Sequence, residues 1–245
     1  MRTLTTAGTL LVVAILVVGA LALNACRLAI PAGSGVSTTE ERSVADFDRL
    51  AFTFLGEMTI VQDGSESLTI TGDDNIVPRI VTEVDDGMLT IRATPGTVGQ
   101  PVVPLRYELH VKELSDITLS GLGSIDAEAL RASRLRLVMS GAGSLAIEQL
   151  EADEVDSTLS GLGNVTVGGA VARQEVLVSG AGNYDGGALR SAVADVAVTG
   201  LGNADVNVSE RLTAEISGSG SITYVGRPEV EQMVTGLGTI RRGEE

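Results

Sequence analysis

Seven copies of a short motif, Ser/Thr-Gly-x-Gly, constrain the fold of the second half of this chain. The steps between their first glycines are 20, 20, 19, 20, 18 and 18 residues. The motif glycines are Gly121, Gly123, Gly141, Gly143, Gly161, Gly163, Gly180, Gly182, Gly200, Gly202, Gly218, Gly220, Gly236 and Gly238. A period this regular is typical of a stacked repeat, in which each unit buries its apolar face only against its neighbours.

The residues around the glycines favour strands over helices. Two positions before the first glycine, all seven repeats are apolar, from Leu119 to Val234. Four positions after it, none is charged, from Ile125 to Ile240. The position four before the glycine is mostly apolar as well, and it shares a strand face with the position two before. This is the period-2 pattern of a strand with one buried side.

The two glycines of each motif are expected to form a tight corner, because glycine reaches positive φ without a Cβ penalty. Each unit then reads as strand, glycine corner, short strand and polar return. The prediction is an all-β, right-handed parallel β-helix or solenoid with rungs of 18–20 residues, and its handedness follows the preference of parallel crossovers. With rungs roughly 4.8 Å apart, the seven corners would span roughly 29 Å.

Polar residues also repeat at the corners. Ser or Thr precedes each first glycine, and Ser, Asn or Thr follows each second glycine. In a stack these residues would lie over their own kind and could pass side-chain hydrogen bonds from rung to rung. A ligand-binding groove could use the same residues, so the pattern by itself leaves both interpretations open.

The stretch 44–112 lacks the motif but keeps strand patterning. Asp63-Gly64 and Asp86-Gly87 look like turns between its strands. We interpret it as the atypical opening rungs and cap of the same rod, followed by the seven repeats in 113–240. One elongated domain over 44–240 results, with a charged tail at 241–245.

Residues 1–26 have a different character. Leu10 to Leu23 are 14 apolar or small residues, a length that suits a signal peptide better than a membrane span. The sole cysteine, Cys26, ends a segment that resembles a bacterial lipobox, although Asn24 departs from it. We predict lipidation at Cys26, with an uncleaved anchor helix as the alternative, and a flexible tether over 27–43. The protein would be exported and membrane-anchored at the extracytoplasmic face of the envelope.

Charge limits the partners. The net charge is −15, and cleavage before Cys26 would leave 16 basic and 32 acidic residues. An acidic surface repels nucleic acid and anionic lipid, so no nucleic-acid partner is expected. A single cysteine also excludes an intrachain disulfide.

Most catalytic constellations are missing. The third glycine of a dinucleotide fingerprint is absent from every corner, and Lys112, the only lysine, follows no glycine-rich loop. His110, the only histidine, shares the polar face of its strand with Glu108, so a solvated histidine is expected there and not a catalytic base. With one His and one Cys a zinc site is unsupported, and no cofactor is predicted.

Paired carboxylates are the best enzymatic option. Asp185 and Asp205 hold equivalent positions in successive rungs, so they could act on polysaccharide or bind calcium. Asp73 and Asp74 are further calcium candidates in an acidic turn. The simpler interpretation is that Asp185 and Asp205 point to solvent and that Asp73 and Asp74 belong to an ordinary acidic turn.

The chain resembles a known bacterial family. The run Val44-Ala-Asp-Phe-Asp-Arg-Leu, then Thr71-Gly-Asp-Asp-Asn-Ile, then the repeated Ser-Gly-x-Gly-Ser/Asn is similar to the auto-transporter adhesin head GIN domain over roughly 44–240. The resemblance implies a β-helical envelope domain, often behind a lipoprotein signal. It transfers no catalytic residue.

These observations predict a non-enzymatic envelope lipoprotein. Its repetitive surface would bind or adhere to an envelope or surface ligand that the sequence does not name. A β-helix polysaccharide lyase or hydrolase is one alternative, and a structural or assembly component of the envelope is another.

Overall fold

The computed structural model describes residues 32–244 except 95, 97 and 98. In this part of the chain every long element is a strand, and all sixteen strands join one sheet. No helix there has the length and apolar character needed to cross a membrane. The predicted signal segment, Cys26 and the first residues of the tether lie outside the described residues.

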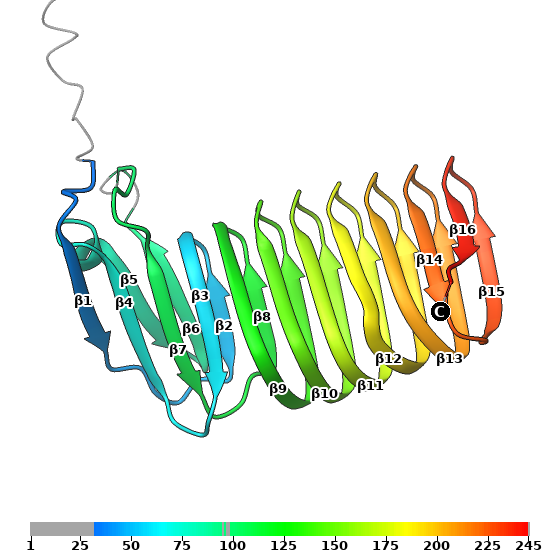
Figure 1. Cartoon of the computed structure of the whole chain (residues 1–245), viewed down its shortest axis with the longest axis horizontal. Helices are drawn as coiled ribbons and strands as arrows, with labels where there is room; N and C mark the ends of the chain where they lie inside the picture. Colours follow the sequence, from blue (N-terminus) through cyan, green and yellow to red (C-terminus); the bar gives the residue numbers. More distant parts are fainter. Residues whose placement is uncertain (1–31, 95, 97–98, 245) are drawn as a thin grey trace, which may run out of the picture. The chain divides into compact units, whose positions relative to one another are not determined.

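The repeats form a β-solenoid whose long strands are parallel and in register (Figure 1). Leu145, for example, pairs with Ile125 in one neighbouring coil and with Val165 in the other. The coils are built from β9 (Leu122–Met139), β10 (Ser144–Leu159), β11 (Asn164–Val178), β12 (Asn183–Val198), β13 (Asn203–Ile216), β14 (Ser221–Val225), β15 (Glu229–Val234) and β16 (Thr239–Arg242).

Each coil has one sharp corner and one gentle bend. The strands break at the Gly-x-Gly corners, which lie in a row along the upper edge in Figure 1. On the opposite edge the long strands turn while staying paired, apart from small register shifts such as that after Ile147. The predicted polar return, such as 126–131, is therefore strand. The predicted charged tail also begins as strand, because β16 includes Arg241 and Arg242.

The core consists of the columns expected from the sequence. Side chains four positions after the first glycine are buried from Ile125 to Ile222, and those two positions before it from Leu119 to Ile216. Only the last coil departs, where Val234 is 45% exposed because no further coil covers it in the described residues. The period-2 pattern thus placed the buried face correctly, since alternate side chains of a strand share a side.

The opening coils do not stack in chain order. β2 (Arg49–Phe52) lies between β6 (Met88–Ala93) and β8 (Asp116–Leu119), parallel to both. β3 (Leu55–Gln62) lies between β7 (Arg106–Val111) and β9, again parallel to both. Residues 49–62 therefore form the coil next to the repeats, and the later residues 88–111 form the coil beyond it.

Antiparallel strands close this end of the sheet. β4 (Ser67–Asp73) pairs with β7, and β1 (Ser37–Arg42) pairs with β4 as the outermost strand. β5 (Ile80–Asp85), preceded by the 3-10 turn Val77–Arg79, pairs with β6 through the predicted turn at 86–87. The tether prediction is wrong for 37–42, because those residues form a paired strand.

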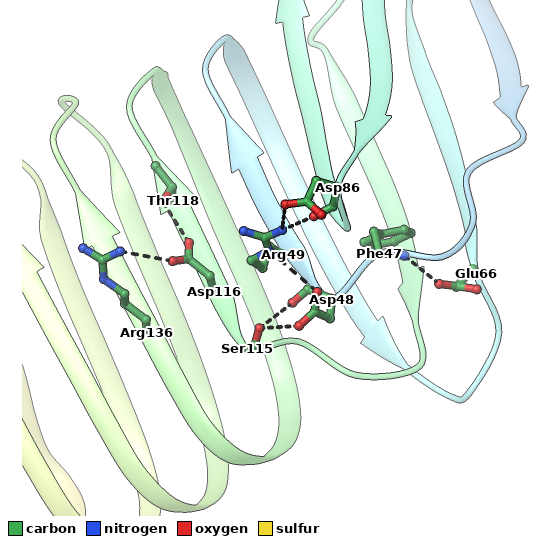
Figure 2. A network of polar contacts seen from close by, with 9 residues as sticks. All are labelled: Phe47, Asp48, Arg49, Glu66, Asp86, Ser115, Asp116, Thr118 and Arg136. Carbon is green, nitrogen blue, oxygen red and sulfur yellow. Dashed lines mark hydrogen bonds and ion pairs between the residues drawn. The ribbon is translucent and has the colours of Figure 1, made fainter.

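A polar network holds the displaced coil in place (Figure 2). Ser115 donates its hydroxyl to Asp48 Oδ2 at 2.6 Å and its backbone N–H to the Asp48 carbonyl at 2.7 Å. Arg49 reaches Asp86, at the tip of the β5–β6 turn. The network joins segments that are adjacent in space but separated by 67 residues of chain.

Candidate binding surface

The seven corners form a continuous ladder. The N–H of Leu162 donates to the carbonyl of Gly141 in the preceding coil at 3.1 Å, and the N–H of Leu201 donates to that of Gly180 at 2.9 Å. Equivalent bonds join the other neighbouring corners. The corner glycines are therefore stacked in register, as the repeat period predicts.

The corners present three columns of side chains, which we call the corner edge. It is made of the residue before the first glycine, the residue between the glycines and the residue after the second. The columns are Ser120, Ser140, Ser160, Ser179, Thr199, Ser217 and Thr235; Leu122, Ala142, Leu162, Ala181, Leu201, Ser219 and Leu237; and Ser124, Ser144, Asn164, Asn183, Asn203, Ser221 and Thr239.

Large apolar side chains stand exposed in the middle column. Leu122 and Leu201 are each 69% exposed, Leu162 is 72% and Leu237 is 89% exposed. These leucines are solvent-exposed because the residue between the two glycines points away from the core. An exposed apolar row of this kind, rimmed by polar residues, marks an interaction surface more often than isolated surface leucines do.

The corner glycines are needed for a reason other than the one predicted. Positive φ occurs elsewhere, as at Gly64 (87°), and at none of the fourteen corner glycines. A Cβ on Gly161 would instead lie 2.1 Å from the carbonyl oxygen of Gly141. One on Gly182 would lie 2.1 Å from that of Gly163. Close approach of successive backbones, and not a left-handed conformation, requires glycine here.

The predicted polar ladder is confirmed in the third column. The side-chain amide of Asn183 donates to Asn164 Oδ1 at 3.1 Å, and that of Asn203 donates to Asn183 Oδ1 at 2.9 Å. Ser221 continues the series by donating its hydroxyl to Asn203 Oδ1 at 2.7 Å. Hydrogen bonds between these side chains hold them in a fixed row. A partner that binds the row would therefore lose little side-chain entropy.

The corner edge carries no charge. Three columns over seven corners make 21 positions without an Asp, Glu, Lys or Arg, in a chain that is 20% charged. The charges begin beside it, where Asp126, Asp185 and Asp205 lie exposed on the adjoining strands. The surface therefore combines hydroxyl, amide and aliphatic groups and suits a neutral partner.

The four calcium candidates lie in two unrelated places. Asp73 is fully buried, and its carboxylate accepts hydrogen bonds from the N–H groups of Gly35 at 2.7 Å and of Val102 and Val103 at 3.0 Å. Burial raises the pKa of Asp73, but these bonds outweigh it and lower that pKa overall. Asp74 accepts the Ser34 hydroxyl. Asp73 thus fastens two loops of the opening coils.

Asp185 and Asp205 are paired in register on β12 and β13, as predicted, and both are exposed. Asp185 Oδ1 accepts the N–H of Gly187 at 3.2 Å. Across residues 32–244, leaving out the three undescribed positions, no three His, Cys, Asp or Glu side chains gather closely enough to hold a metal ion. Calcium binding stays a prediction.

His110 lies on the polar face of β7, as expected. Asp63 Oδ2 lies 2.7 Å from its Nδ1, and Glu108 Oε1 lies 3.1 Å from its Nε2. The bonds to Asp63 and Glu108 raise the pKa of His110, whereas hydrogen bonds from Ser65 and His110 lower the pKa of Asp63 to about 2. Ser65 donates its hydroxyl to Asp63 at 2.7 Å. A catalytic triad needs that hydroxyl on the imidazole instead.

A buried polar cluster escaped the sequence interpretation. Inside the coils, the Tyr184 hydroxyl donates to Gln174 Oε1 at 3.2 Å, and Gln174 Nε2 donates to Ser191 Oγ at 2.8 Å. Burial raises the pKa of Tyr184. The signal that could have revealed the cluster is the hydroxyl of Tyr184 in an otherwise aliphatic column. Because it is enclosed, the cluster serves the core and not a ligand.

One groove lies on the bend side of the coils, away from the corner edge. It has a volume of about 540 Å³, and its polar lining includes Glu113, Arg131, Ser133, Glu151 and Asp153. Arg131 Nε donates to Glu151 Oε2 at 2.7 Å, so the nearest carboxylate has its charge balanced. This ion pair joins β9 to β10.

The sequence matches the family described as "Putative auto-transporter adhesin, head GIN domain" over residues 46–228. The chain belongs to this family. The resemblance noted from the sequence is thereby confirmed, and no curated protein matches the chain. Family and fold together support an adhesion-like role, with exposure at or beyond the cell surface.

Solved structures share the fold of this GIN-domain protein. A "putative adhesin" from Bacteroides fragilis NCTC 9343 is 26% identical with a TM-score of 0.84, over 87% of this chain and 100% of its own. Another from Parabacteroides distasonis ATCC 8503 is 25% identical with a TM-score of 0.71, over 86% and 99%. A "putative lipid binding protein" from the same organism is 24% identical with a TM-score of 0.73, over 87% and 99%, and shows the fold alone.

Proposed function

We propose that this protein is a non-enzymatic lipoprotein of the bacterial envelope that adheres to surfaces through its corner edge. The observation that carries the proposal is the corner edge itself, with 21 uncharged positions in three columns on a chain of net charge −15. Polar and aliphatic groups repeat there at every coil, at roughly 4.8 Å. A repeated surface suits a partner that is itself extended or repetitive.

Repetition supplies affinity that single contacts lack. Each corner offers at least two hydroxyl or amide groups and one small or aliphatic side chain, which together bind weakly. Many such contacts made at once on a crowded cell surface add through effective concentration. Adhesion of this type needs no reaction centre, and this agrees with His110 being occupied by two carboxylates.

The binding test uses the full chain coupled to beads. We expect the beads to adhere to bacterial envelopes or host-cell surfaces and to release no products from acidic or neutral polysaccharides. The double variant Ser160→Glu/Ser179→Glu should reduce adhesion, because it places charge on the corner edge. Thr166→Glu, which adds a charge at an exposed position of β11 outside the corner edge, is the control. Polysaccharide cleavage that disappears in Asp185→Asn or Asp205→Asn would instead establish an enzyme.

The proposed anchor rests on Cys26 and the apolar segment before it. Acylation with two or three chains would hold the protein at the membrane, whereas one chain is marginal. Mass spectrometry of the native N-terminus should find a lipid-modified Cys26, and Cys26→Ser should abolish that modification. Finding Met1 or Arg2 in the mature protein would favour an uncleaved anchor helix.

A further inference from the structure

The middle column of the corner edge alternates large and small side chains. Along the stack it reads Leu, Ala, Leu, Ala, Leu, Ser, Leu. All seven are exposed, and the corners that carry them are joined in register by backbone hydrogen bonds. A leucine therefore projects at every second coil, roughly 9.6 Å apart, with space for an incoming side chain between each pair.

We propose that the corner edge binds the corner edge of a second copy, with the two stacks antiparallel. This rests on the proposed function and names the partner of that same surface. In the proposed register, Leu162 of each copy lies against Ala181 of the other. The two-fold axis then passes between these two coils, and the contact is closed and self-complementary.

The register follows from the pattern. With the axis between Leu162 and Ala181, Ala142 meets Leu201 of the second copy, and Leu122 meets its Ser219. Each of these leucines then enters a position that holds a small residue. Shifting the axis by half a coil, onto Ala181, would set Leu162 against Leu201 and leave alanine facing alanine. A leucine that faces alanine or serine packs closely and buries its apolar surface. Pairs of leucines would hold the two edges apart and leave the facing alanines out of contact.

The coil before the repeats carries one further corner, which marks the end of the corner edge. Leu55 pairs with Leu122 on the neighbouring strand, so Thr53-Phe54-Leu55-Gly56 occupies an eighth corner position, in which Phe54 replaces the first glycine of the motif. In the proposed register this position faces Leu237 of the second copy. Leu55 packs partly against the core, and the exposed Glu57 takes the third-column place at this corner, so the uncharged edge ends here.

Charge indicates that copies meet at this edge. Each chain has a net charge of −15, and like charges brought together across an interface are destabilising. The strands beside the corner edge expose acids such as Asp126 and Asp205. The corner edge is uncharged over its whole length, so two copies can approach there without facing carboxylates.

The size of the edge predicts a weak complex. Six coil intervals and three columns cover roughly 29 by 13 Å, or about 400 Å² per copy. The total of about 800 Å² is below the 1,200–2,000 Å² of stable complexes, so association should be transient in solution. Copies displayed densely on facing cells would gain avidity from many such contacts.

The test is sedimentation equilibrium of the full chain in a neutral detergent, comparing variants that differ only on the surface. Wild type should associate weakly and reversibly to a dimer. Ala181→Leu fills the hole opposite Leu162 and should weaken association by roughly tenfold or more. Leu already occupies this position in other corners, so the fold tolerates the change. Thr166→Leu adds the same apolar character off the edge and should have no effect.

The double variant Leu162→Ala/Ala181→Leu exchanges knob and hole and should restore the association that Ala181→Leu loses. If Ala181→Leu strengthens association, the edge is a general apolar surface, such as one for lipid, and the paired geometry is overturned. A wild type that stays monomeric up to about 1 mM overturns it too. In either case, adhesion of coated beads to other surfaces would leave the proposed function standing.

Discussion

At the corners, one atom decides which residue is allowed. The carbonyl oxygen of each corner glycine points at the equivalent glycine of the next coil. A side chain on that second glycine would have no room. Gly163 illustrates this, since a Cβ there would lie 2.5 Å from Gly143 O and 2.9 Å from Met139 Sδ. The residue between the glycines points outward, which is why leucine, alanine and serine are all accepted there.

The substitution Gly163→Ala separates the two explanations of the corner glycines. At an ordinary negative φ with open space, Gly→Ala stabilises by about 0.4–1 kcal/mol through the unfolded chain. Here the clash with Gly143 should reverse the sign and destabilise by about 1–3 kcal/mol. Thermal unfolding of the full chain, followed by circular dichroism, measures the change.

Ala181→Val is the matched control at the residue scale, because its side chain points into solvent and should change stability by less than about 0.5 kcal/mol. If Gly163→Ala raises the melting temperature, the neighbouring backbones leave room for a Cβ at this corner. The close-approach explanation would then be wrong for this corner.

At the scale of elements, polar side chains tie the displaced opening coil to its neighbours. β3 lies between β7 and β9, and Asp63, just after β3, holds His110 on β7. Lys112 forms an ion pair with Glu66, whose side chain is only 6% exposed. Such contacts select a pairing order that apolar patterning alone does not specify, because any strand with one apolar face could fill the same slot.

The His110 contacts make this region sensitive to pH. The pKa of His110 is raised by folding, so its contribution to stability is fully present below the unfolded value of 6.5. It is lost as the pH rises through the raised folded value. His110→Gln should therefore lower the melting temperature more at pH 5 than at pH 9.

Arg106→Gln is the control on the same strand. Arg106 pairs with Glu57 at 3.4 Å. An arginine–glutamate pair is not expected to change between pH 5 and pH 9, so the effect should be equal at the two pH values. A loss for His110→Gln that is as large at pH 9 as at pH 5 would show that packing, not charge, is the contribution of His110.

At the scale of the described chain, the sheet is one stack in which each coil contacts mainly its neighbours. The repeats follow chain order, so each can add to the last. The opening coils cannot form this way, because residues 49–62 must lie between 88–111 and 116–127. This end requires distant segments to assemble together, which costs loop entropy before the contacts form.

Prediction from sequence succeeded where the pattern repeats and is local. Columns such as Ile125 to Ile222 reveal their burial because a strand alternates sides, and the Asp63-Gly64 and Asp86-Gly87 turns follow from glycine's preference for positive φ. Prediction failed for Ser37–Arg42. The polar composition of this segment resembles a tether, but the segment pairs with β4 as a strand. Prediction also missed the corner at Leu55, because Phe54 replaces the first glycine there.

The solenoid, its coil length, its buried columns and its uncharged corners can all be read from the amino-acid sequence, since they are set by residues a few positions apart. Only the tertiary structure decided why the corner glycines are required, which coils are neighbours at the opening end and which side chains share a face. Those properties depend on distances between segments far apart in the chain, such as the 2.1 Å that a Cβ on Gly161 would leave to Gly141 O. No local pattern encodes such distances.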